Sequence, residues 1–94
     1  MTEIDVRCEP AGDGWTCWVT VHERGSSTRH EVQVSRRELE RLAPGAADPG
    51  ALVRAAFGFL LEHEPKESIL RAFDLPVIGR YFPGWEVDVR RRLG

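Results

Sequence analysis

Residues 15–21 of the chain read WTCWVTV, in which every second position is apolar: Trp15, Cys17, Val19 and Val21. A period of two places these side chains on one side of an extended strand. The same alternation occurs before and after this stretch, at Ile4, Val6 and Cys8 and again at Val32 and Val34. The pattern predicts three strands within residues 1–35, each with one buried face and one solvated face.

Two segments rich in turn-forming residues separate these strands, PAGDG at residues 10–14 and RGSST at residues 24–28. A first turn centred on residues 12–13 places Cys8 opposite Cys17, and a second centred on residues 26–27 places Val19 opposite Val34. We expect both registers because they set apolar side chains against each other. The opposite face then carries a mostly polar set: Asp5, Arg7, Trp18, Thr20, His22, Glu31 and Gln33.

Helical signals begin at Ser35, where the sequence SRRE matches a capping box. Asp48 and Pro49 are typical of the start of a second helix, which should run to about His63 and is apolar on nearly all sides. Pro65 should open a short helix through Phe73. A further helix should start at residues 74–76 and end at Pro83 and Gly84, while residues 84–94 could form either a helix or an added strand.

The order of these elements predicts an α+β domain, a three-stranded antiparallel β-meander followed by three to four helices packed on one face. The 94 residues suit a single domain. It should divide into the meander at 1–35, a helical part at 36–83 and a basic tail at 84–94.

The segment from Glu64 to Pro83 resembles the C-terminal part of a group of short uncharacterised bacterial proteins. That resemblance implies no activity. The amino-acid composition also favours a bacterial source, because Lys66 is the only lysine among 13 basic residues and Asn is absent.

A net charge of −2, from 13 basic and 15 acidic residues, argues against a uniformly basic nucleic-acid-binding protein. The first residues show no basic patch followed by an apolar run, and no apolar stretch approaches the roughly 20 residues of a membrane span. We therefore expect a cytoplasmic protein with no membrane association.

Chemistry-bearing motifs are sparse. Cys8 and Cys17 should be cross-strand neighbours that stay as buried thiols in a reducing cytoplasm. Cys17 and His22 should face opposite sides of the sheet, so they cannot share a metal ion. The chain has no G-x-S-x-G, Walker or H-E-x-x-H motif. We expect no catalytic residue, no metal and no cofactor.

Two groups of aromatic residues suggest an interaction surface instead. Trp18 should lie on the outer face beside Arg7, where it is either open to a partner, or covered by Arg7, or covered by the C-terminal tail with Trp85. The second group has five large apolar side chains in nine residues, more than two short helices can bury: Val77, Ile78, Tyr81, Phe82 and Trp85. We expect a non-enzymatic module that contacts another protein, or a second copy, through Trp18, Arg7, Tyr81, Phe82 and Trp85.

A different class of function, nucleic-acid binding, is the alternative. Two short helices joined near residue 74 superficially resemble a helix-turn-helix, but the turn lacks Gly and Pro76 stands where a recognition helix would begin. The arginines that could contact phosphates are Arg71, Arg80, Arg90, Arg91 and Arg92. A small enzyme is the least favoured reading.

Overall fold

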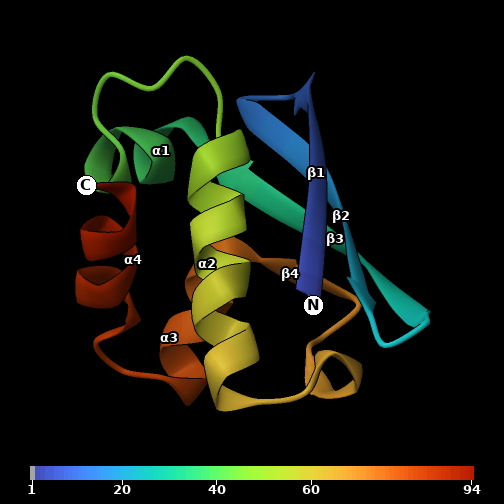
Figure 1. The fold of residues 1–94 in the computed structure, drawn as a ribbon. Helices are drawn as coiled ribbons and strands as arrows, with labels where there is room; N and C mark the ends of the chain where they lie inside the picture. The colour runs from blue at the N-terminus through green and yellow to red at the C-terminus, as the bar shows by residue number, and fades with distance from the viewer. Residues whose placement is uncertain (1) are drawn as a thin grey trace.

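The structure, a computed structural model, describes residues 2–94 and has the predicted α+β architecture (Figure 1). The strands and helices, in chain order, are β1 (Thr2–Ala11), β2 (Gly14–Glu23), β3 (Ser26–Ser35), α1 (Arg36–Leu42), α2 (Gly50–His63), β4 (Ala72–Asp74), α3 (Ile78–Tyr81) and α4 (Trp85–Leu93). Two short 3₁₀ turns flank β4, η1 (Lys66–Ser68) and η2 (Leu75–Val77).

The first hairpin has the predicted register, with Val6 opposite Val19 and Cys8 opposite Cys17. The predicted register of the second hairpin is wrong, because Val19 lies opposite His30 instead of Val34. The turn is formed by Arg24 and Gly25, both with positive φ, which is what a two-residue hairpin turn matched to the strand twist requires. The shift along β3 is an even number of residues, so the valines keep the buried face.

A fourth strand, β4, was not predicted. The helix expected through Phe73 is replaced by the single turn η1 and an extended segment. This segment runs parallel to β3, with Val32 opposite Phe73, and the Glu31 amide donates to the Arg71 carbonyl at 2.8 Å. The spacing of Ile69 and Phe73 suggested a helix. The unpaired edge of β3 instead provides hydrogen-bond partners for the backbone of this segment, and local propensity does not reveal such distant partners.

Helix boundaries follow local capping. The Ser35 hydroxyl accepts a hydrogen bond from the Glu38 amide at 3.1 Å, as the capping box predicts. Helix α2 starts one residue later than expected, and the Asp48 carboxylate accepts from the Gly50 amide at 2.9 Å. The tail, which the sequence left open, is helix α4, with acidic residues in its first turn and arginines in its last.

Helix α2 lies between the sheet and α4, so it is buried on opposite sides (Figure 1). Its Phe57 has no exposed surface, and neither do Val32 of the sheet and Val89 of α4. Val19 and Val34 are buried as the alternating pattern predicts. Helix α2 is also too short for a membrane span, at 14 residues against about 20, and no helix within residues 2–94 is long and apolar enough to cross one.

Cys8 and Cys17 form a disulfide between β1 and β2, so the expectation of two thiols is wrong. Their Cα atoms are 4.0 Å apart, the close spacing of a non-hydrogen-bonded pair in an antiparallel ladder. The register already made the two residues neighbours, and only the assumed reducing compartment argued against the bond. Disulfides of this kind are typical of oxidising environments.

We expect removal of this disulfide to lower the free energy of unfolding by about 2 kcal/mol, because the bond closes a short loop that the unfolded chain would otherwise leave open. Urea denaturation of the Cys8→Ala/Cys17→Ala double variant, compared with the oxidised protein, measures the difference. The oxidised protein should lose the same amount in a reducing agent that leaves the double variant unaffected. Coincident transitions for oxidised and reduced protein would contradict the prediction.

Candidate functional site

A small apolar groove lies at the end of the helical layer, between the last turn of α2, the segment from η1 to β4, and α3. Its volume is about 130 Å³. Its lining is mainly apolar, with one carboxylate and one hydroxyl contributed by Glu64 and Ser68. The apolar residues of the lining are Leu60, Ile69, Leu70, Phe73, Val77, Ile78, Tyr81 and Phe82.

Two residues of this lining expose large apolar side chains to solvent. Tyr81 is 64% exposed and Leu70 is 45% exposed. Phe82 is half-buried and meets Phe59 edge-on, with 5.7 Å between ring centroids. Exposed apolar side chains around a hollow are typical of a binding site. Tyr81 and Phe82 were predicted interaction residues, whereas Leu70 was not.

The position of Leu70 depends on a buried histidine that sequence reasoning missed. His30 is only 2% exposed, and its Nδ1 donates to the Leu70 carbonyl at 2.7 Å. Its Nε2 accepts from the Thr28 hydroxyl at 2.8 Å, the arrangement that a carbonyl partner on Nδ1 imposes on a neutral ring. Burial lowers the pKa of His30, and the nearby charge of Arg71 acts in the same direction. His30 shares the alternation of Val32 and Val34, and this was the available signal.

Trp85, the fifth predicted interaction residue, belongs to the core. It is 3% exposed at the start of α4. Its indole packs so closely on α3 that a Cβ atom at Gly79 would lie 3.2 Å from the Trp85 Nε1. Trp85 therefore offers no surface to a partner, and it does not cover Trp18.

Trp18 and Arg7 lie on the outer face of the sheet, separate from the groove. The Arg7 guanidinium carbon is 4.8 Å from the centroid of the Trp18 ring, and Arg7 also pairs with Glu9. Trp18 remains 37% exposed. The predicted aromatic residues thus occupy two surfaces and the core, so they do not form one patch.

The arginines proposed for nucleic-acid binding are dispersed. Arg92 pairs with Glu62 at 2.6 Å and with Asp88 at 3.3 Å, and the hydrogen bond that Arg92 donates to Glu62 raises the pKa of Arg92. Arg90 donates to the Arg41 carbonyl at 3.3 Å. Arg90, Arg91 and Arg92 are successive residues of a helix, so they fan over much of its circumference instead of lining one side. Arg71 and Arg80 lie on exposed positions near the groove-lining Leu70 and Tyr81.

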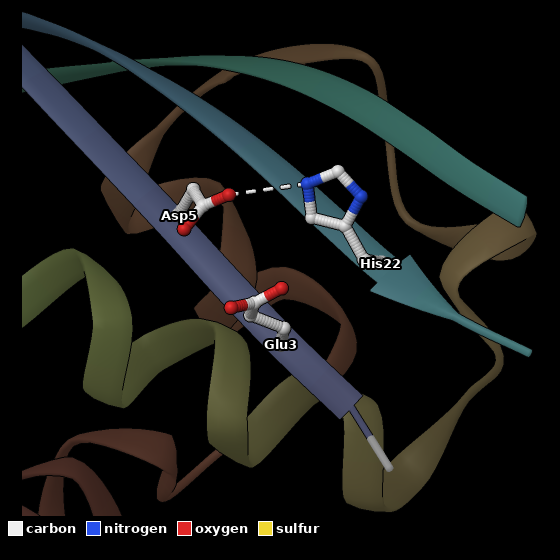
Figure 2. A group of neighbouring side chains, drawn as sticks. All are labelled: Glu3, Asp5 and His22. Carbon is white, nitrogen blue, oxygen red and sulfur yellow. Dashed lines mark hydrogen bonds and ion pairs between the residues drawn. The ribbon is translucent and has the colours of Figure 1, made fainter. Parts of the chain in front are cut away.

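A third surface carries potential metal ligands. Glu3 and Asp5 of β1 and His22 of β2 project from the solvent face of the sheet (Figure 2). Their ligand atoms lie within 4.8 Å of one another, and the His22 Nε2 is 3.1 Å from an Asp5 oxygen. A metal ion shared by His22 and Cys17 was excluded from the sequence, whereas the first hairpin places two carboxylates beside His22.

Comparison of the chain with protein-family models, with curated proteins and with solved structures found no match.

Proposed function

We propose that this protein is a non-enzymatic interaction module that holds one large apolar side chain of a partner protein in the groove between α2, β4 and α3. The observation that supports the proposal is the position of Leu70 and Tyr81. Within residues 2–94 there are four exposed large apolar side chains, Trp18, Leu70, Tyr81 and Val87, and two of them border this one hollow.

The size of the groove selects the kind of ligand. Its volume of about 130 Å³ is close to that of an engineered cavity of about 150 Å³ that binds benzene. Pockets for whole cofactors or drug-sized molecules have about 300–1,000 Å³. The groove therefore suits a single aromatic or leucine side chain, the type of anchor that dominates the energetics of many protein interfaces.

The charges near the groove favour an anchor with acidic neighbours. Arg71 and Arg80 adjoin Leu70 and Tyr81 in the chain, are exposed, and take part in none of the ion pairs formed within residues 2–94. The groove itself contributes a single carboxylate, that of Glu64. We therefore propose a partner segment in which an aromatic residue is flanked by Asp or Glu.

We also propose the cytoplasm of a bacterium as the compartment in which this module acts. The Cys8–Cys17 disulfide would be subject to reduction there. The groove is built from residues 60–82, so its lining includes neither cysteine. Reduction of the disulfide therefore changes none of the lining residues.

A short peptide tests the groove directly. We expect the acetylated, amidated peptide DEWED to shift the backbone amide resonances of residues 68–82, and the peptides DEAED and KKWKK to bind at least about tenfold more weakly, because each lacks one of the two features. Tyr81→Ser should weaken DEWED binding by about tenfold. Val87→Ser is the matched control, since Val87 is 60% exposed on α4 and is not part of the groove lining.

Three results would contradict the proposal. Equal binding of DEWED and DEAED would show that no anchor enters the groove. Resonance shifts centred on Trp18 would place the interaction on the sheet instead. Concentration-dependent dimerisation that Tyr81→Ser abolishes would identify a second copy of the chain as the occupant.

A further inference from the structure

The first hairpin brings one imidazole and two carboxylates together on an exposed, rigid surface. Glu3 is the direct cross-strand partner of His22, and Asp5 lies two residues further along β1. A step of two residues returns the side chain to the same face, so all three groups project to the solvent side (Figure 2). None of the three is used by the groove or by the Trp18 surface.

We propose that Glu3, Asp5 and His22 bind a zinc ion, or a closely related divalent transition metal, with water completing the coordination. One nitrogen and two oxygen donors form a set that zinc accepts, and zinc sites with three protein ligands keep a position for water. An imidazole favours transition metals, whereas magnesium and calcium prefer oxygen donors alone.

The ligand atoms are close to the required geometry. Donor atoms about 2.0–2.2 Å from a tetrahedral zinc ion are about 3.4 Å apart. The His22 nitrogen and an Asp5 oxygen are separated by 3.1 Å, and all three ligand atoms lie within 4.8 Å of one another. The His22 and Asp5 side chains are 46% and 63% exposed, so rotation about their side-chain bonds can close the remaining distance.

The backbone that carries these ligands is well fixed. Strands β1 and β2 are ten residues each and paired along their whole length. In the oxidised protein the Cys8–Cys17 disulfide adds a covalent link between them, and the ladder of pairs holds them with or without it. Ligands on regular strands keep their relative positions better than ligands on loops, so little order has to be gained when the metal binds.

A hollow lies beside two of the three ligands, and Asp5 is not part of its lining. Glu3 and His22 line this hollow of about 340 Å³, which continues to Glu23 and the β2–β3 turn. Glu23 lines it too, but its carboxylate accepts from the Thr2 hydroxyl at 2.9 Å, lies 4.0 Å from the Lys66 Nζ and belongs to the face of β2 opposite His22. Arg24 lines it as well, and its positive charge opposes a cation.

Calorimetric titration of the full chain, freed of metal with a chelator, measures binding of ZnCl₂ directly. We expect one zinc per chain, and at least about tenfold weaker binding for His22→Ala and for Glu3→Gln, because each variant removes one ligand. His63→Ala is the matched control, since His63 is an exposed histidine at the end of α2 and should leave the affinity unchanged. MgCl₂ should give no comparable binding.

A second variant should change the zinc affinity in the opposite direction. Arg24→Asn should tighten zinc binding severalfold, because it removes a nearby positive charge and Asn tolerates the positive φ of this position. Circular dichroism confirms that each variant is folded. The proposal is overturned if zinc does not bind at millimolar concentration, if His22→Ala binds as tightly as the unchanged protein, or if His63→Ala loses as much affinity as His22→Ala.

Discussion

Replacement of Trp85 by Ala is expected to lower the free energy of unfolding by about 3–5 kcal/mol, the usual cost of removing a large aromatic side chain from a well-packed core. Trp85 is 3% exposed, lies at the first position of α4 and packs on Gly79 of α3. Its loss leaves a cavity where the two helices meet. A domain of this size has about 5–15 kcal/mol of stability in total, so the variant should be close to unfolding.

Tyr81→Ala is the control variant, because it removes an exposed aromatic side chain instead of a buried one. Tyr81 is 64% exposed, so its removal should change the free energy of unfolding by no more than about 0.5 kcal/mol. Urea denaturation followed by circular dichroism measures both variants. If Trp85→Ala were as stable as Tyr81→Ala, Trp85 would be a surface residue and the expectation drawn from sequence would be correct after all.

Trp85 illustrates why the aromatic segment was only partly predictable. Five large apolar side chains in nine residues are visible in the sequence, but which of them reach the core depends on where the last ten residues pack. The pattern did not decide between helix and strand for these residues. Once they form α4 against α2, Trp85 is buried and Tyr81 is left outside.

The strands show the same division between local and long-range information. Alternation alone identifies the core-facing side of β1, β2 and β3, although that side of β1 is only partly buried. The pattern survives the wrong register of the second hairpin, because the turn at Arg24 and Gly25 shifts each cross-strand partner by an even number of positions. Strand β4 could not be predicted in this way. It has three residues and pairs in parallel with a strand about forty positions earlier in the chain.

The candidate sites also combine residues that local sequence patterns identify with residues that only long-range contacts bring into place. The groove combines Tyr81 and Phe82, which composition singled out, with Leu70, whose position depends on a hydrogen bond from a distant strand. The cluster of Glu3, Asp5 and His22 follows directly from the predicted first hairpin, because residues whose numbers sum to 25 are cross-strand partners there. No sequence motif marks it, because its three residues come together only through the strand pairing.

Substitution of His30 by Leu should be the second most damaging change. We expect it to lower the free energy of unfolding by about 2–4 kcal/mol at pH 7, because it leaves the Leu70 carbonyl and the Thr28 hydroxyl without their partner. Leucine fills a similar volume beside Phe57, whose ring centroid is 5.2 Å from that of His30. The cost therefore comes from the lost hydrogen bonds more than from a cavity.

The pH dependence of stability in the same variant shows how much the titration of the His30 imidazole contributes. Burial lowers the pKa of His30 in the folded protein below 6.5, the ordinary histidine value that applies to the unfolded chain. Between these two pKa values the unfolded chain binds a proton that the folded protein does not, so the stability linked to His30 is fully present above pH 6.5 and declines as the pH falls toward the folded pKa. The Leu variant lacks this decline. Its deficit relative to the unchanged protein should therefore shrink between pH 7 and pH 5.

Urea denaturation at several pH values measures the loss of stability in His30→Leu, and hydrogen exchange shows which part of the structure is loosened. The Glu31 amide, which donates to the Arg71 carbonyl next to Leu70, should exchange faster in His30→Leu, since β4 loses its anchor to the sheet. His30→Gln is the control: its amide can donate to the Leu70 carbonyl and accept from Thr28, so it should recover part of the stability at pH 7 without recovering the pH dependence. A deficit that stays constant from pH 7 to pH 5 would show that His30 titrates equally in the folded and unfolded chains, and that its burial carries no electrostatic cost.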